Sequence, residues 1–215
     1  AAVGTYAAAY MAGSLFTTLI SPIHTVLFPA MAALWNQGKS PEIGAYLTQT
    51  IRISALIVFP ALAGAAIIAE PLMDLLIRDE TGPIAGYYLL LATSFVVFAF
   101  GIPCGDLLLT AGQNRRIVAL NGGLAVANLV LNLMLVPALG LWGAIASTLA
   151  CHLSYTALTG YWAGGVVEFS VPWQSIIRAL CATLIMALIL LAVFGTQNNS
   201  IALPVVCGSA LYMTL

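Results

Sequence analysis

The residues best suited to polar chemistry recur along one face of the first hydrophobic segment. Tyr6, Tyr10, Gly13, Thr17 and His24 follow one another at spacings of three, four or seven, which places them on one side of an α-helix. Hydroxyl groups and an imidazole can line a water-filled cavity and hydrogen-bond the hydroxyls of a sugar. The same residue types also pack between helices. Both interpretations stay open for Tyr10, Thr17 and His24.

Two later segments carry similar polar faces. Each has four residues at helical spacing, namely Asn121, Ala125, Asn128 and Asn132 in one, and Thr148, His152, Tyr155 and Thr159 in the other. Polar side chains are rare where they would face lipid, so these faces should point into a helical bundle. They serve either as interhelical hydrogen bonds or as the lining of a cavity. Asn128, Asn132 and His152 are the candidate ligand-binding residues among them.

Two charged residues lie inside hydrophobic segments. Arg52 is about ten residues into one segment, and Asp106 is about five residues in from the same side of the next. An ion pair between them is expected, because pairing is how such charges are tolerated in a membrane. Alternatively, the guanidinium of Arg52 is free to bind a diphosphate through two hydrogen bonds. Asp106 is also the candidate carboxylate for ion coupling.

The motifs of several other function classes are missing. The two histidines form no H-E-x-x-H metal motif, and neither a Walker A loop nor a serine nucleophile elbow is present. The four cysteines show no C-x-x-C spacing, which favours buried small hydrophobes over a metal or disulfide framework. No basic tract is available to bind nucleic acid. We therefore expect no enzyme, no metal and no cofactor.

The distribution of charge predicts the elements that carry these residues. Only 6% of residues are charged and 62% are hydrophobic, whereas a soluble domain has charge at about a quarter of its positions. A membrane helix needs about 20 mainly apolar residues. The fold class is therefore an all-α, polytopic transmembrane bundle of about six full spans and a truncated seventh. The spans are expected over about residues 4–35, 43–69, 84–111, 117–136, 142–163 and 173–194, with a short interfacial helix over 70–77.

Proline and glycine mark the expected bends and turns. Pro22 should kink the first span, and Gly101-Ile-Pro103 should break the third. Polar turns are expected at 36–41, 78–83 and 112–116. The truncated seventh span should begin after Ser200. We divide the chain into a five-span core, 1–165, and C-terminal spans, 166–215.

Loop charge predicts the orientation. Five of the six basic residues lie in or beside the first, third and fifth loops, and only Arg78 lies in the others. By the positive-inside rule the loops at 36–42, 112–116 and 165–175 should be cytoplasmic. The chain begins at Ala1 and stops at Leu215, about 15 residues into an apolar run, so we expect it to be a piece of a longer protein.

Several short motifs resemble those of a known family. They are Val3-Gly-Thr-Tyr6, Val26-Leu-Phe-Pro29, Glu70-Pro-Leu-Met-Asp-Leu-Leu76, Leu108-Leu-Thr-Ala-Gly-Gln-Asn-Arg115, Asn128-Leu-Val-Leu-Asn132 and Pro137-Ala-Leu-Gly-Leu-Trp-Gly-Ala144. In the fourth motif the glycine falls one place earlier than in the family pattern. Together the motifs resemble the C-terminal half of a polysaccharide flippase of the Wzx type. This type belongs to the MOP (multidrug/oligosaccharidyl-lipid/polysaccharide) exporter superfamily.

The resemblance implies a function and partners. The chain would be one lobe of a transporter that flips an undecaprenyl-diphosphate-linked oligosaccharide across the bacterial cytoplasmic membrane for polysaccharide biosynthesis. Its partners would be the lipid bilayer, the lipid-linked glycan and the missing N-terminal lobe. The alternative within transport is a cation-coupled multidrug antiporter of the MATE branch, with Asp106 as its carboxylate. A membrane-embedded glycosyltransferase or polymerase, or a structural membrane subunit, is the alternative of another class.

Overall fold

The chain folds into a bundle of long helices. The computed structural model describes residues 2–77 and 83–194, and within these residues it contains helices and no strand. The helices of this part of the chain are α1 (Ala2–Asn36), α2 (Ser40–Ile67), α3 (Ala69–Leu76), α4 (Ile84–Thr110), α5 (Asn114–Leu139), α6 (Leu141–Gly164) and α7 (Trp173–Phe194). The expected seventh span, beyond Ser200, lies outside the described residues.

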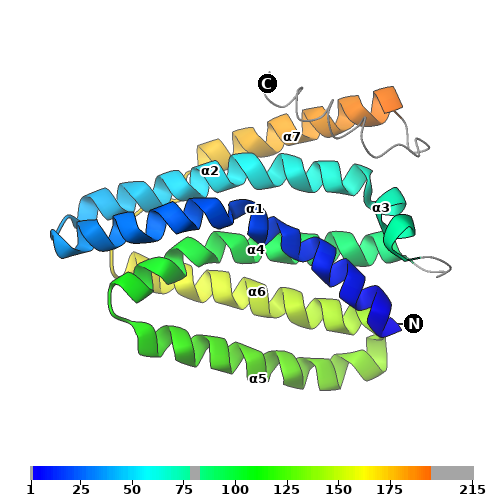
Figure 1. The fold of residues 1–215 in the computed structure, drawn as a ribbon, viewed down its shortest axis with the longest axis horizontal. Helices are drawn as coiled ribbons and strands as arrows, with labels where there is room; N and C mark the ends of the chain where they lie inside the picture. Colours follow the sequence, from blue (N-terminus) through cyan, green and yellow to red (C-terminus); the bar gives the residue numbers. More distant parts are fainter. Residues whose placement is uncertain (1, 78–82, 195–215) are drawn as a thin grey trace.

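The long helices lie roughly parallel, with α4 at the centre (Figure 1). α1 and α6 both contact α4, while α5 contacts α6 and α7 contacts α2. α1 bends midway along its length (Figure 1), in the region of Pro22. Proline lacks the N–H that would bond the carbonyl one turn earlier, and its ring crowds that carbonyl, so the helix kinks. The expected kink of the first span is therefore present.

The spans predicted from charge and hydropathy match the observed helices to within three residues at each end. Three helix ends or turns use glycine with positive φ, at Gly38 (70°), Gly112 (73°) and Gly140 (59°). This conformation is accessible to glycine because it has no Cβ. The predicted break at Gly101-Ile-Pro103 is wrong, since α4 runs without interruption to Thr110. A proline inside a helix removes one hydrogen bond, and the flanking turns are held here by packing on both sides.

The bundle has the composition of a membrane domain. α1, α2, α4 and α5 are each long and apolar enough to span a bilayer. α6 has 24 residues but several hydroxyl side chains, and the apolar part of α7 that is described covers Trp173–Ile189. Four of the six predicted crossings are therefore helices that are both long enough and apolar enough to span a bilayer. α6 and α7 do not meet both conditions over the described residues.

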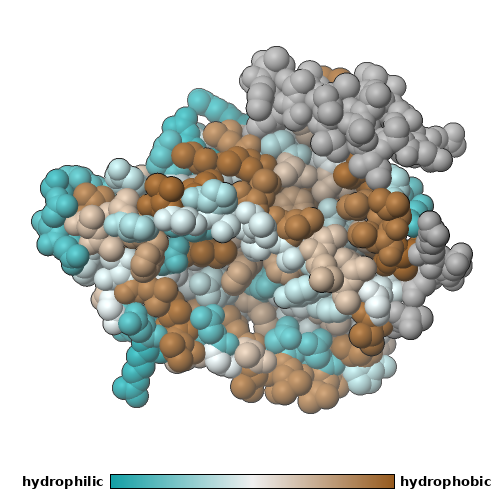
Figure 2. All heavy atoms as spheres, viewed as in Figure 1, coloured by the Kyte–Doolittle hydropathy of each residue, from teal (hydrophilic) through white to brown (hydrophobic). Residues whose placement is uncertain are grey.

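Large apolar side chains cover much of the outside. On α5, Leu133 and Met134 are 69% and 67% exposed, and on α7 Leu188 is 67% exposed. Figure 2 shows hydrophobic residues along the lower edge, over α5, and hydrophilic residues gathered at the end where α1 turns into α2. Such a surface suits lipid along the sides of the helices and water at their ends.

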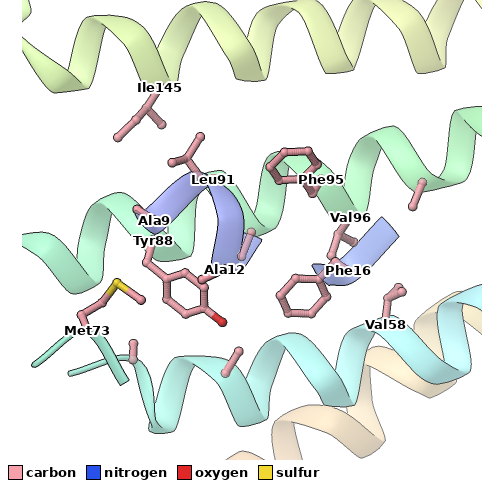
Figure 3. Packing of buried hydrophobic residues seen from close by; sticks show 14 of the residues in the cluster. Ala9, Ala12, Phe16, Val58, Met73, Tyr88, Leu91, Phe95, Val96 and Ile145 are labelled. Atoms are coloured by element: carbon pink, nitrogen blue, oxygen red, sulfur yellow. The ribbon is translucent and has the colours of Figure 1, made fainter. Parts of the chain in front are cut away.

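The main core lies where α1, α2 and α4 meet. Ala9 and Phe16 of α1 pack with Val58 of α2 and with Leu91 and Val96 of α4 (Figure 3). Gly13 brings α1 and α4 close together, because a Cβ on it would lie 3.2 Å from the backbone nitrogen of Ala92. Close packing of small residues is the main source of helix association in lipid, where burial of apolar surface contributes little.

The contact between α4 and α6 depends on glycine as well. A Cβ on Gly101 would lie 2.8 Å from Thr156 Oγ1, and one on Gly105 would lie 2.5 Å from the hydroxyl of Tyr155. Thr156 Oγ1 donates a 2.8 Å hydrogen bond to the Val97 carbonyl across the same contact. The position of α6, and of the polar residues on it, is therefore set by the small residues of α4.

Candidate functional site

Polar residues from α1, α5 and α6 meet around one cavity of about 310 Å³, which we call the polar cavity. Its lining consists of Tyr6, Tyr10, Phe98, Asn121, Leu124, Ala125, Asn128, Thr148, Cys151, His152 and Tyr155. The three polar faces predicted from helical spacing thus contribute residues to one space. No Asp or Glu belongs to this lining.

Two hydroxyls join α1 to α6 at the rim of the cavity. The Tyr6 hydroxyl lies 3.1 Å from Thr148 Oγ1, and Thr148 Oγ1 donates its own hydrogen to the Ala144 carbonyl at 3.0 Å. A hydroxyl has one hydrogen to donate, so Tyr6 is the donor and Thr148 the acceptor. The neighbouring Tyr10 ring lies edge-on to Phe95, with centroids 4.9 Å apart, and its side chain is partly exposed.

His152 is held in a fixed orientation on α6. Its Nδ1 lies 3.1 Å from the Ser94 carbonyl and 3.2 Å from Ser94 Oγ, and its ring stacks on Phe98 with centroids 4.7 Å apart. A carbonyl only accepts, so Nδ1 carries the hydrogen, as assigned from this network. In the neutral imidazole Nε2 is then a hydrogen-bond acceptor, and it belongs to a side chain that lines the polar cavity.

The asparagines of α5 divide into two roles. Asn132 Nδ2 donates to Asn128 Oδ1 at 2.9 Å. Ser147 Oγ of α6 shares its one hydrogen between Asn132 Oδ1 at 2.8 Å and the Ala144 carbonyl at 2.9 Å. Asn132 therefore lies in a hydrogen-bonded chain between the two helices and does not line the polar cavity. Asn128 does line it, and its Nδ2 group is available as a donor there.

A second cavity, of about 370 Å³, lies at the bend of α1. We call it the bend cavity, and it is lined by Thr17, Thr18, Ser21, His24, Phe98 and Ile102. Phe98 also lines the polar cavity, so its ring is a wall common to both. The Thr17 hydroxyl donates 2.7 Å to the Ser14 carbonyl of its own helix, which occupies its one hydrogen.

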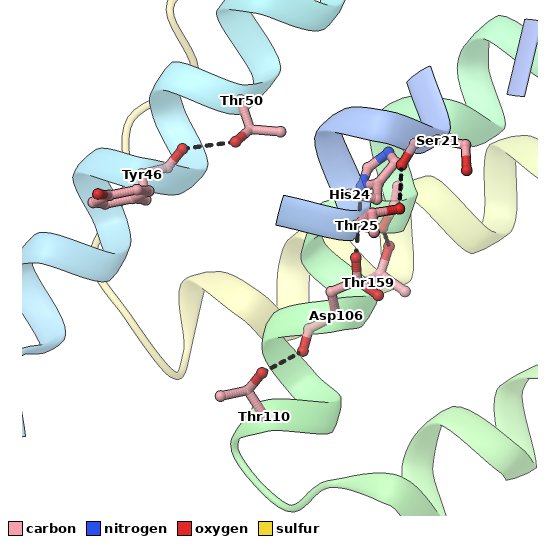
Figure 4. A network of polar contacts seen from close by, with 9 residues as sticks. Ser21, His24, Thr25, Tyr46, Thr50, Asp106, Thr110 and Thr159 are labelled. Carbon is pink, nitrogen blue, oxygen red and sulfur yellow. Dashed lines mark hydrogen bonds and ion pairs between the residues drawn. The ribbon is translucent and has the colours of Figure 1, made fainter. Parts of the chain in front are cut away.

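His24 faces Asp106 across the α1–α4 contact (Figure 4). Its Nδ1 lies 3.5 Å from Asp106 Oδ2, and the two side chains are 12% and 19% exposed. This is an ion-pair distance without hydrogen-bond geometry, since both ring nitrogens of His24 are buried without a hydrogen-bond partner. The charge of Asp106 is therefore faced by the imidazole, which neutralises it when protonated.

The expected ion pair between Arg52 and Asp106 is wrong. Among the described residues, the ion pairs within 4.0 Å are His24–Asp106 and Lys39–Glu42. Arg52 is exposed. Its neighbour Ile51 is buried, and so are Leu47 and Ala55, which lie one helical turn on either side of Ile51. Depth along a helix can be judged from sequence spacing, but not which side of α2 carries Arg52, and that side is exposed.

The helical spacing of polar residues did not indicate that Ser94 and Phe98 belong to the site. Ser94 is fully buried and orients His152, and Phe98 separates the two cavities. A signal was available in the sequence, because residues 94, 98, 101 and 105 follow one another at spacings of three or four. They therefore share the face of α4 that meets α6.

Comparison with known proteins gives three consistent findings. Residues 1–80 match the model of a family described as "Polysaccharide biosynthesis protein". The chain is 23% identical over 186 residues to the "Probable low-salt glycan biosynthesis flippase Agl15" of Haloferax volcanii, covering 86% of this chain and 39% of that protein. Its fold matches "Lipid II flippase MurJ, inward closed conformation" with a TM-score of 0.57 at 12% identity, covering 93% of this chain and 45% of that chain. The resemblance to flippases of the MOP superfamily is confirmed.

The two matched flippases are longer than this chain. The chain spans about two fifths of the length of the curated relative and less than half of the solved flippase. The match to the family model covers α1, α2 and α3, and therefore ends before the asparagine face of α5 and the histidine of α6. The apolar helices of the described residues are those of a multi-pass membrane protein.

Proposed function

We propose that this chain is one lobe of a transporter that flips a lipid-linked oligosaccharide across a membrane for polysaccharide biosynthesis. Both matched proteins are named as flippases, one of them in glycan biosynthesis and one for lipid II. The second lobe would come from the part of the protein that lies outside this chain. Between two such lobes the glycan would cross while its lipid tail stays in the bilayer.

The observation that carries this proposal is the chemistry of the polar cavity. Its polar groups are mainly hydroxyl, amide and imidazole, which are neutral hydrogen-bonding groups, and its aromatic rings come from Tyr6, Tyr10, Phe98 and Tyr155. A sugar offers many neutral hydroxyls, each of them both donor and acceptor, so a lining of this kind matches it. In the otherwise apolar bundle, such a set of convergent polar groups is expected at a ligand site.

The same chemistry argues against the MATE alternative. Neither cavity has an Asp or Glu among its lining residues in the described part of the chain. A cationic drug held away from water would need a carboxylate to compensate its charge. Asp106 lies next to the bend cavity but faces His24.

The alternative of another class, a membrane-embedded glycosyltransferase or polymerase, would need a long loop outside the membrane. The longest described loop between helices, 165–172, is short for such a site.

Arg52 fits the lipid-linked part of the substrate. Its side chain is exposed and no acidic side chain in the described residues lies within ion-pair distance. A guanidinium in this state can bind a diphosphate through two parallel hydrogen bonds. We infer that Arg52 contacts the undecaprenyl diphosphate, while Tyr10, Asn128 and His152 contact the glycan.

The proposed location is the bacterial cytoplasmic membrane, with the loops at 36–42, 112–116 and 165–175 in the cytoplasm. The α1–α2, α4–α5 and α6–α7 connections lie at one end of the bundle (Figure 1), and Lys39, Arg115, Arg116 and Arg178 lie in or beside them. If Lys39→Cys in the full-length protein reacts with a membrane-impermeant thiol reagent from outside intact cells, this orientation is wrong.

The function is tested by changing the lining without changing the fold. His152→Leu in the full-length protein removes the acceptor at the cavity, and we expect export of surface polysaccharide to fall by up to about tenfold at equal protein level. Ser154→Ala is the matched control, because its exposed hydroxyl bonds only the Ala150 carbonyl of its own helix. Unchanged export in His152→Leu, or loss of drug resistance instead, would contradict the proposal.

A further inference from the structure

A third cavity lies apart from the two already described, at the end of the bundle that carries most of the cations. Its volume is about 620 Å³, and its lining includes Gln113, Arg116, Gly160, Tyr161, Trp162 and Gly164. It is formed where α5 begins and α6 ends, so it lies at the same end of the bundle as the α1–α2 turn (Figure 1). None of its lining residues belongs to the polar cavity or to the bend cavity.

The cation of this cavity has unused hydrogen-bond donors. Arg116 Nη1 donates 2.9 Å to Gln113 Oε1, a neutral acceptor, and in the described residues no carboxylate lies within ion-pair distance of it. A guanidinium has five N–H donors, so four remain. Arg115 adds a second positive charge next to it in the sequence. The nearest acidic residue in the adjoining loop is Glu168, which is not part of the lining.

The space itself exists because glycines form part of its wall. A Cβ on Gly160 or on Gly164 would meet no atom within 4 Å, so larger side chains there would project into open space. The aromatic residues beside them are placed as at a membrane surface. Tyr161 is 77% exposed, and Trp162 is partly buried in the wall. Tyrosine and tryptophan are enriched where headgroups meet the hydrocarbon layer.

We propose that this cavity binds the phosphate group of an anionic membrane phospholipid. The unpaired guanidinium of Arg116 would hold the phosphate, the space beside Gly160 would take the rest of the headgroup, and Tyr161 and Trp162 would lie at headgroup depth. The acyl chains would run along the exposed apolar side of α5, where Val118, two residues after Arg116, is 70% exposed. Basic pockets between membrane helices are suited to anionic headgroups for these reasons. This ligand is separate from the transported glycan.

The test uses the purified full-length protein in detergent, titrated with phosphatidylglycerol and, in parallel, with zwitterionic phosphatidylcholine. Bound lipid is counted by native mass spectrometry. We expect the protein to retain one phosphatidylglycerol in preference to phosphatidylcholine, and Arg116→Gln to weaken that binding about fivefold. Gly160→Leu fills the cavity with a residue that favours a helix, and we expect it to abolish the preference.

Two controls separate this site from general charge and from folding. Lys39→Gln removes one positive charge at the same end of the bundle but outside the cavity, so the preference should remain. Gly123→Leu adds the same side chain at another open position of a helix, where a Cβ meets no atom within 4 Å. Both cavity variants should elute as folded protein with unchanged helix content.

Undecaprenyl diphosphate, titrated in the same way, distinguishes the two sources of a lipid phosphate. If it displaces phosphatidylglycerol and its own binding is lost in Arg116→Gln, the cavity belongs to the substrate and the phospholipid proposal is overturned. A preference for phosphatidylglycerol that survives both Arg116→Gln and Gly160→Leu overturns it as well. Loss of the preference in these two variants, with undecaprenyl diphosphate binding unchanged, supports it.

Discussion

The two cavities on either side of Phe98 hold one histidine each, and the two imidazoles are in opposite situations. His152 of the polar cavity is fixed by the Ser94 carbonyl and by stacking on Phe98, with Nε2 left for a ligand. His24 of the bend cavity has no hydrogen-bond partner on either nitrogen and faces the carboxylate of Asp106. The first arrangement suits recognition of a neutral, polar molecule. The second places an imidazole opposite a half-buried carboxylate at the bend of a helix.

The two histidines should also differ in how firmly their rings are held. A buried polar group that is satisfied contributes to a rigid site, whereas one without a partner is costly and tends to find one. The His152 ring is therefore expected to keep its position when the cavity is empty. The His24 ring has its ion-pair contact with Asp106 in place of hydrogen bonds. Substitution of Asp106 should therefore change the position of the His24 side chain on α1.

The largest effect is expected from the contact that positions both cavities. Gly101→Leu would place a side chain where even a Cβ would lie within 3 Å of Thr156, and the resulting overpacking should destabilise the protein by about 1–3 kcal/mol. Thermal unfolding of the full-length protein measures it. Gly64→Leu is the control, because a Cβ at Gly64 meets no atom within 4 Å and the change should be tolerated. Equal stability of the two variants would contradict the close α4–α6 contact.

A smaller effect should distinguish the observed charge pair from the expected one. In a double-mutant cycle with His24→Ala and Asp106→Ala, the two changes should be non-additive by at least about 0.5 kcal/mol, because they remove one interaction. Arg52→Ala combined with Asp106→Ala should be additive, since the structure does not bring these residues together. Stability of the purified protein is the measured quantity. Additivity in the first cycle would contradict the His24–Asp106 pair, and coupling in the second would restore the pair expected from the sequence.

The smallest effect is expected at Thr17. Its hydroxyl bonds the Ser14 carbonyl of its own helix, so Thr17→Val removes no contact between helices. Export of surface polysaccharide should stay within about twofold of the unchanged protein, consistent with a change of less than about 0.5 kcal/mol. Thr17→Leu together with His24→Leu, which also removes the imidazole, should reduce export further. A severe loss from Thr17→Val alone would mean that this hydroxyl contacts the substrate.

The helices could be predicted from the sequence because the charge-free runs specify what must face lipid. Both ends of α4 and the start of α7 were predicted to within one residue of where they lie. The convergence of the polar faces on one cavity could be anticipated only as a possibility, since helical spacing shows which residues share a face and not which helix they meet. The wrong Arg52–Asp106 pair has this origin.

Some of the site depends on residues that no polar pattern reveals. Ser94 lies beside Thr93 in the long apolar run of α4, and its role appears only when α6 brings His152 beside it. The break expected at Pro103 failed for a related reason. Local propensity favoured a break there, whereas packing against α1 and α6 keeps α4 continuous.

The central claim is that the polar cavity binds the glycan, and Cys151, which lines that cavity, offers the most direct test. In the full-length protein with Cys151 as the single cysteine, the rate of modification by a small thiol reagent is measured with and without substrate. We predict that a lipid-linked oligosaccharide slows the modification, while the same lipid phosphate without the glycan does not. An equal rate at saturating lipid-linked oligosaccharide would contradict the claim.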